Sequence, residues 1–372
     1  MIFIPASYEE SRLRFRSSLP IPRNLWPGAS FNSHILSNEE GLSIDWMSAD
    51  ALHSKDKLFV LTTGQHGIEG YVGSAMLQIF MEEVLPRFDP QTSGILLVHA
   101  INPWGMKHRQ RGNPHHVDLN RNFINGSFAS LSDCNPDYPR LTPFLNPKRP
   151  LGNIRLEKLL FFDQVLQSLV RFGARRSREA TLMGQYIMAQ GIYFGGQELQ
   201  EETRALMELY RASFEGYRQI VHLDMHSGYG PRFQMTLVNS PLEKMNAAET
   251  MSQYGVGRVA AANADEFYTM HGDMIDWEYG LVQREFPQAR FFGAACEFGT
   301  FGDSLLSGAR SWRITIFKNQ ANLYGTNPAA QEWVDREYCE LYLPSEPAWF
   351  ENAQADARQT FNGILTAEGY IL

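Results

Sequence analysis

Short runs of consecutive apolar residues alternate along this chain with longer stretches in which apolar residues recur every three or four positions. Residues 57–63, Lys-Leu-Phe-Val-Leu-Thr-Thr, form one such run that ends at Gly64, and a second run over 95–101 ends at Asn102-Pro103. Short apolar runs bounded by turn residues are typical of buried strands. Further runs predict strands over 222–225, 235–238 and 291–296.

Apolar residues at helical spacing lie between these strands. In residues 69–84 they include Val72, Met76 and Ile79, and the pattern stops before Pro86. Similar patterns predict helices over 157–172, 200–214 and 241–254. Strands separated by helices predict an α/β fold, here a single domain with a mixed, largely parallel central sheet covered by helices on both faces.

We expect residues 1–372 to form one domain with an insertion at about 125–218. This stretch carries at least two helical patterns, and we interpret it as an addition to one core rather than a second domain. Its first part, residues 125–153, is rich in Pro, Asn, Ser and Gly and predicts a long surface loop. Such loops in compact domains are usually functional lids or mobile segments.

Composition narrows the possible functions. Hydrophobic residues make up 44% and aromatic residues 12% of the chain, which excludes an intrinsically disordered protein. The formal net charge of −8 argues against a broad phosphate-binding surface, so we expect no nucleic-acid partner. The main basic run, Arg175-Arg176-Ser177-Arg178, is interpreted as a solvated helix end.

Cysteine use and the N-terminus bear on the compartment. Cys134, Cys296 and Cys339 are too few and too scattered for a disulfide framework, and no CxxC pair exists for a thiolate zinc site. The N-terminus turns polar by Glu9, too soon for a signal peptide, and no run is long enough to cross a bilayer. We therefore expect a cytoplasmic protein with no membrane contact, and the sequence leaves its oligomeric state open.

Side chains suited to a metal follow two of the predicted strands. His66 and Glu69 come directly after Gly64, and His226 follows the run 222–225. The HxxE spacing lets an imidazole and a carboxylate reach one ion, although a loop histidine and a glutamate placed for the helix dipole explain it equally well. The strand-end His226 favours the metal, because two histidines and a glutamate form a known catalytic zinc set, whereas alone it would be a histidine bonded to backbone.

Three other charged residues stand where catalysis would need them. Glu297 ends the apolar run 291–296, where a charge has no structural reason to be unless it pairs with an arginine. Arg111 and Arg121 are suited to an oxyanion and to bidentate binding of a carboxylate, with structural salt bridges as the alternative.

The segment Asp118-Leu119-Asn120-Arg121-Asn122-Phe123 is the most specific motif. Together with Asn102-Pro103 and Arg111-Gly112-Asn113 before it, and Gly272-Asp273-Met274-Ile275-Asp276-Trp277 after it, it makes the chain resemble the zinc carboxypeptidase (funnelin) family. The resemblance is to a bacterial branch of metallopeptidases with no assigned substrate. The motifs run from about residue 58 to 302, and residues 1–50 and 303–372 match none of them.

The resemblance implies a metal centre and its catalytic groups. It makes His66, Glu69 and His226 the ligands of one Zn²⁺ ion. It makes Glu297 the general base and Arg111 the residue that stabilises the oxyanion. Arg109 lies two residues before Arg111 and is an alternative for that role.

The resemblance also implies how substrate is held. Asn120 and Arg121 would bind a substrate carboxylate, and Tyr268 would close over the bound substrate. Ile275 matches the position that lines the side-chain pocket. Asp118 would orient the ring of His66, since a metal-bound histidine usually passes its other N–H to a carboxylate or carbonyl.

These residues lead us to expect a zinc-dependent, carboxypeptidase-like hydrolase that cleaves a peptide or amide bond next to a carboxylate-bearing residue. The string Gly-x-His-Gly-x-Glu-Gly from Gly64 to Gly70 also resembles the amidohydrolase branch of the family. The alternative is therefore a zinc deacylase acting on N-acyl amino acids or similar small amides. A non-catalytic binding module would require a lost ligand or base, and none is missing.

Overall fold

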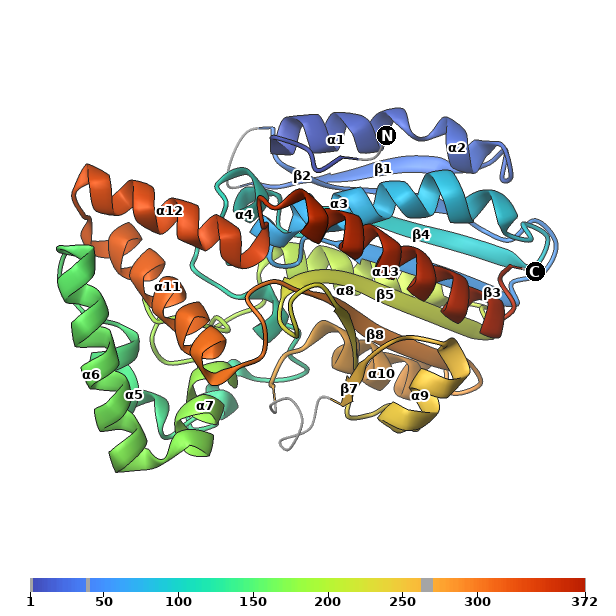
Figure 1. Cartoon of the computed structure of the whole chain (residues 1–372). Coiled ribbons are helices and arrows are strands. Elements are labelled where there is room, and N and C mark those ends of the chain that lie inside the picture. Colours follow the sequence, from blue (N-terminus) through green and yellow to red (C-terminus); the bar gives the residue numbers. More distant parts are fainter. Residues whose placement is uncertain (1–2, 38–40, 262–269, 372) are drawn as a thin grey trace.

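A mixed sheet forms the centre of the molecule, whose computed structural model describes residues 3–37, 41–261 and 270–371 (Figure 1). Its eight strands within these ranges lie in the order β1-β2-β4-β3-β5-β8-β6-β7. Strands β4, β3, β5 and β8 pair in parallel, and β2 and β6 pair antiparallel with the two outer members of this group. The strands are β1 (Ser30–Ile35), β2 (Ser43–Ala49), β3 (Lys57–Thr63), β4 (Ser93–His99), β5 (Gln219–Gly228), β6 (Met235–Asn239), β7 (Val259–Ala261) and β8 (Arg290–Gly299).

Helices cover the sheet and extend beyond one end of it (Figure 1). No helix in the described part of the chain combines the length and apolar character that crossing a membrane requires. The α-helices are α1 (Tyr8–Ser17), α2 (Pro20–Arg23), α3 (Gly70–Ile79), α4 (Pro103–Lys107), α5 (Tyr138–Leu145), α6 (Ile154–Phe172), α7 (Ala174–Leu182), α8 (Glu201–Phe214), α9 (Ala247–Tyr254), α10 (Met274–Glu285), α11 (Leu305–Tyr324), α12 (Pro328–Tyr342) and α13 (Pro347–Ala367).

Successive residues of the central strands face opposite sides of the sheet, and each side packs against its own helices. On one side, Phe59 and Leu61 of β3 belong to a buried cluster with residues of α3 and α13. On the other side, Leu58 and Val60 pack with residues of α8 and α10. The predicted fold class is confirmed: an α/β domain with a mixed, largely parallel sheet covered on both faces.

A third buried cluster joins the insertion to the C-terminal helices. Phe161 of α6 packs with Phe317 of α11 and Tyr338 of α12 in this cluster, which also contains Ile68 beside the candidate metal ligands. Figure 1 shows α5, α6 and α7 gathered with α11 and α12 at one end of the sheet. The segment after residue 302, which matched no motif, therefore helps to enclose the candidate site.

Two local predictions were wrong. Residues 125–153 are not a loop throughout, because α5 forms within them and buries Tyr138, Leu141 and Leu145. The helix predicted over 241–254 begins only at Ala247, because Asn246 and Glu249 form a capping box that starts it there. The other predicted strands and helices are present, with boundaries shifted by a few residues.

Candidate metal centre and active site

Glycines shape the loop that carries His66 and Glu69. Gly64 has φ +71°, a left-handed conformation that side-chain-bearing residues rarely adopt. A Cβ on Gly67 would lie 2.1 Å from the backbone carbon of Gly105, so only glycine lets the loop pack against α4 this closely. The glycines of the Gly64–Gly70 string thus allow the close packing of this loop. The loop conformation in turn positions the side chains of His66 and Glu69.

The side chains of His66, Glu69 and His226 converge in the interior. All three are buried, and one ligand atom of each lies within 4.8 Å of the others, the one such group of three in the described ranges. The Nδ1 atoms of the two histidines are 3.2 Å apart. Glu69 Oε1 is 2.9 Å from Nδ1 of His66, and its Oε2 is 3.0 Å from Nδ1 of His226.

The protonation of these histidines fits a bound cation. Nε2 of His66 is 3.2 Å from Oδ1 of Asp118, and Nε2 of His226 is 2.7 Å from Oδ2 of Asp224. Each imidazole therefore has a carboxylate at both ring nitrogens, and with a cation between the Nδ1 atoms and Glu69 each Nε2 would keep the proton and each Nδ1 would present a lone pair. The spacing fits such a cation, because two nitrogens on tetrahedral zinc stand about 3.3 Å apart.

The pKa values of His226 and Glu69 shift because imidazoles and carboxylates lie close together in the interior. Burial lowers the pKa of His226, but Asp224 and Glu69 raise it more strongly, so that it lies well above 6.5. Burial raises the pKa of Glu69, and the two imidazoles lower it to far below its usual range. A cation at this position would take the place of the proton on His226, and the donor set is one that zinc prefers.

Asp224 is a part of the site that we did not predict. Its Oδ1 accepts a hydrogen bond from Oγ1 of Thr62 at 2.6 Å while its Oδ2 contacts His226. Residues two apart in a strand face the same side of the sheet, so the Asp-x-His spacing on a predicted strand was a usable signal. Asp118 and Asp224 thus hold the two imidazoles in matching ways.

Glu297 lies beside the metal-ligand group because of strand register. In the β5–β8 pair, Glu297 is the direct partner of His226. Its Oε2 atom is buried and makes no hydrogen bond within the described residues, and none of their arginines forms an ion pair with it. Burial raises the pKa of Glu297 to about 7. The carboxylate lines a cavity of about 710 Å³ that His66 and His226 also line.

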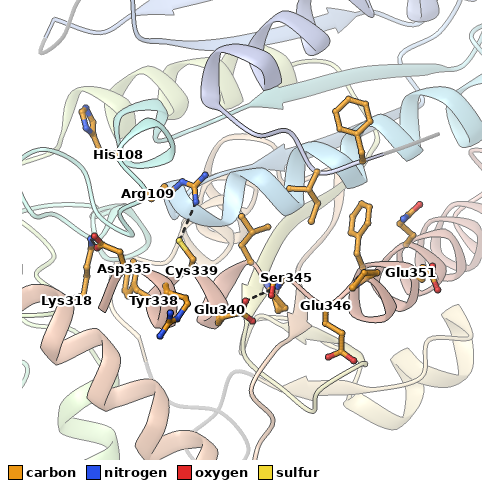
Figure 2. A pocket seen from close by; sticks show the side chains of 18 of the residues that line it. His108, Arg109, Lys318, Asp335, Tyr338, Cys339, Glu340, Ser345, Glu346 and Glu351 are labelled. Atoms are coloured by element: carbon orange, nitrogen blue, oxygen red, sulfur yellow. Dashed lines mark hydrogen bonds and ion pairs between the residues drawn. The ribbon is translucent and has the colours of Figure 1, made fainter. Parts of the chain in front are cut away.

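Arg111 lies at this cavity, whereas Arg109 does not. Nε of Arg111 donates to Oδ2 of Asp118 at 3.0 Å, and its Nη1 is 3.4 Å from Oε1 of Glu69. Arg109 lines a second cavity of about 1260 Å³, where its guanidinium points toward Sγ of Cys339 (Figure 2). That cavity is larger but contains none of the metal-ligand residues, so we assign the chemistry to the smaller one.

Asn120 and Arg121 are both engaged within the protein. Nη1 and Nη2 of Arg121 donate to the carbonyls of Asn120 and Leu182 at 2.8 and 2.9 Å, and Arg121 is fully buried. Oδ1 of Asn120 accepts from the backbone N–H of Met274, and its side chain also bonds Asp273. Asn120 lines the cavity and Arg121 does not, so carboxylate binding by Arg121 remains a prediction.

The remaining cavity wall combines apolar and charged groups. Ile275 lines the cavity, and its contact with a substrate side chain stays a prediction, while Tyr268 lies outside the described residues. Arg178 of α7 also lines it and forms no ion pair within the described residues. Arg178 lies close enough to Tyr229 to lower the pKa of that phenol, although burial raises it overall. In the sequence, Arg178 stands out only as part of a basic run.

Comparison with known families shows which family the chain belongs to. Residues 5–356 match the model of a family described as a protein of unknown function, DUF2817. The chain belongs to this family. No curated protein sequence matches it.

Several solved structures are similar to it at low sequence identity. Carboxypeptidase A from Helicoverpa armigera is 13% identical, with 85% of this chain and 72% of that one covered and a TM-score of 0.47. Succinylglutamate desuccinylase from Chromobacterium violaceum is 14% identical, with 82% and 73% covered and a TM-score of 0.38. An aspartoacylase family protein from Mesorhizobium loti is 14% identical, with 79% and 66% covered and a TM-score of 0.36. At TM-scores below 0.5 we base function on the site residues alone.

Proposed function

We propose that this member of the DUF2817 family is a zinc-dependent hydrolase that cleaves a peptide or amide bond next to a carboxylate-bearing residue. The observation that carries the proposal is the convergence of His66, Glu69 and His226 beside the buried, unbonded carboxylate oxygen of Glu297. A metal site that served only stability would have no use for a neighbouring base at a cavity wall.

The donor set suits one zinc ion held by His66, Glu69 and His226. When bound, zinc polarises a carbonyl and lowers the pKa of water to about 7. Glu297, whose pKa is raised to about 7 by burial, accepts the proton of the attacking water and then passes it to the leaving nitrogen. Arg111 is anchored by Asp118 and donates to the oxyanion that develops at the attacked carbon.

Substrate binding is assigned to the cavity wall. Because the guanidinium of Arg121 already donates to two carbonyls, we place the substrate carboxylate at Arg178, whose planar guanidinium matches it bidentately. Ile275 offers an apolar contact for the neighbouring side chain. The volume of about 710 Å³ suits a short peptide end.

A zinc deacylase of N-acyl amino acids would use the same metal and base and is the second candidate. The two activities are separated by assaying the purified zinc-loaded protein with peptides that have a free C-terminus, with their C-terminal amides, and with N-acyl amino acids. Preference for the free acid supports the carboxypeptidase, and exclusive cleavage of N-acyl compounds supports the deacylase. Equal hydrolysis of acid and amide contradicts recognition of a carboxylate, and no hydrolysis of any amide contradicts the proposal.

A further inference from the structure

Helix α6 turns a broad apolar face to solvent. Its opposite side packs into the third buried cluster through Phe161, which is 3% exposed, whereas Val170 on the outer side is 81% exposed. At 100° per residue the exposed apolar positions span about half of the helix circumference. Within this face Asp163 and Gln167 bond each other at 2.7 Å. The exposed apolar side chains of α6 are Leu156, Leu159, Leu160, Phe162, Leu166, Leu169 and Val170.

Positive charge surrounds this face in an otherwise acidic protein. Residues 146–182 contain eight lysines and arginines and three acidic residues, a local net charge of +5 in a chain of −8. Arg149, Arg175 and Arg176 among them form ion pairs with Glu157, Glu179 and Asp137. Arg155 and Arg171, near the two ends of α6, are exposed and form no ion pair with any described residue. The basic run that the sequence suggested was a solvated helix end, Arg175 to Arg178, begins one turn beyond α6.

We propose that α6 and the start of α7 form a docking face for the surface of an anionic phospholipid bilayer. An amphipathic helix with a wide apolar face and basic residues at its edges lies in the plane of a membrane interface, with its apolar side chains at the headgroup–acyl boundary. Arg155 and Arg171 then reach headgroup phosphates. Such a helix does not cross the membrane, so the proposal does not conflict with the lack of a spanning helix in the described part of the chain.

The same charges disfavour a second copy of this chain as the occupant. Two α6 helices packed antiparallel across a two-fold axis would bring Arg155 of one copy close to Arg171 and Arg175 of the other, and their Asp163 side chains close together. Like charges opposed in this way repel. A face that spans about half the helix is also wider than the seam that one partner helix covers.

Docking would place the catalytic cavity next to the bilayer. Val165 and Leu169 of α6 line that cavity, as do Arg175 of α7 and Leu305 of α11. Leu305 is 92% exposed and extends the apolar surface at the cavity edge. Substrate would then reach the cavity from the lipid side of the molecule.

Sedimentation of the full chain with sucrose-loaded vesicles tests the proposal. Vesicles of phosphatidylcholine alone are compared with an equal mixture of phosphatidylcholine and phosphatidylglycerol, at low and at high salt. We expect binding to the anionic vesicles that weakens with salt, and little binding to the neutral ones. Leu159→Glu with Leu166→Glu should weaken binding about 100-fold, since two apolar anchors become charged. Each of Arg155→Gln and Arg171→Gln should weaken it about fivefold.

The controls separate lipid binding from folding, catalysis and dimerisation. Leu13→Glu with Ile35→Glu changes two equally exposed apolar residues elsewhere and should leave binding unchanged, as should the base variant Glu297→Gln. No binding to anionic vesicles, or equal and salt-independent binding to both kinds, overturns the proposal. A lipid-free dimer in sedimentation velocity that the Leu159→Glu, Leu166→Glu variant dissociates also overturns it, by showing that a second copy covers α6.

Discussion

Nε2 of His226 lies 2.7 Å from Oδ2 of Asp224, two residues earlier on the same strand. With a cation at the site, this contact would keep the proton of His226 on Nε2 and direct the lone pair of Nδ1 toward the ion. Thr62 holds the other oxygen of Asp224, so the carboxylate itself is fixed by a neighbouring strand. A carboxylate that orients a metal-binding imidazole also raises its basicity, which strengthens metal binding.

Asp224→Asn should weaken zinc binding about 10- to 100-fold without unfolding the protein, because Asn keeps the shape but not the charge. Competition with a chromogenic chelator measures the zinc Kd. Asp276→Asn, at another carboxyl group that lines the cavity, is the matched control and should keep the wild-type Kd. An unchanged Kd in Asp224→Asn would mean that His226 is oriented by something else.

Glu297→Gln should retain zinc and lose about 10²- to 10⁴-fold in kcat, because the amide cannot accept the proton of water. Zinc content and steady-state rates on the best substrate of the screen test this together. Wild-type turnover would assign the base elsewhere. Loss of zinc in this variant would instead make Glu297 a ligand.

Replacing each of three arginines with alanine should change a different measured quantity. Arg178→Ala should raise KM about tenfold or more with little change in kcat, since it removes binding of the substrate carboxylate. Arg111→Ala should mainly lower kcat, because its charge acts on the oxyanion. Arg121→Ala should lower the free energy of unfolding by about 2–3 kcal/mol, because its guanidinium bonds two carbonyls.

The changes in KM, kcat and stability of these variants together decide which arginine binds the substrate carboxylate. A raised KM in Arg121→Ala with unchanged stability would assign binding of the substrate carboxylate to Arg121. Zinc content of Arg111→Ala must be measured alongside its rates, because Arg111 also contacts Asp118 and Glu69.

The pH dependence of stability should show a contribution from His99. Burial lowers the pKa of His99 to about 4. Below pH 6.5 the unfolded chain takes up a proton at this histidine that the folded chain does not, so the free energy of unfolding falls as pH falls from about 6.5 to 4. The expected loss is about 1.4 kcal/mol per pH unit within this window. Above pH 6.5 both states are neutral and the contribution is absent.

His99→Phe should remove this slope in urea-unfolding curves recorded between pH 6.5 and 5, since a phenyl ring keeps the stacking on Phe15 and carries no proton. His53→Phe, at an exposed histidine, is the control and should keep it. An identical slope in wild type and His99→Phe would place the responsible group elsewhere.

Much of the fold could be predicted from the sequence because the central strands are buried on both faces. Residues 58–61 and 95–98 are apolar without a break, a pattern that few other structures produce, and both lie within strands. The edge strand β1 was missed because four of its six residues, Ser30–Ile35, are polar and most are exposed. Helix α5 was missed because Pro143 and the surrounding polar residues obscure its apolar spacing.

Side-chain direction limited the prediction of the site. The residue types at His66, Glu69 and His226 suggested a metal, and the fold brings them together. The pairing of His226 with Glu297 depends on the register between two strands more than 60 residues apart in sequence, which no local pattern specifies. Whether Arg121 points into the cavity or toward the backbone depends on the surrounding insertion, where Leu182 supplies one of its partners.

Zinc content per chain is the measurement that tests the central claim most directly. The purified protein, stripped by a chelator and reloaded with excess zinc before desalting, should bind one zinc ion per chain by elemental analysis. His226→Ala should retain none after the same treatment, while Glu297→Gln should retain one. Full zinc in His226→Ala, or none in the wild type, would contradict a catalytic centre built on His66, Glu69 and His226.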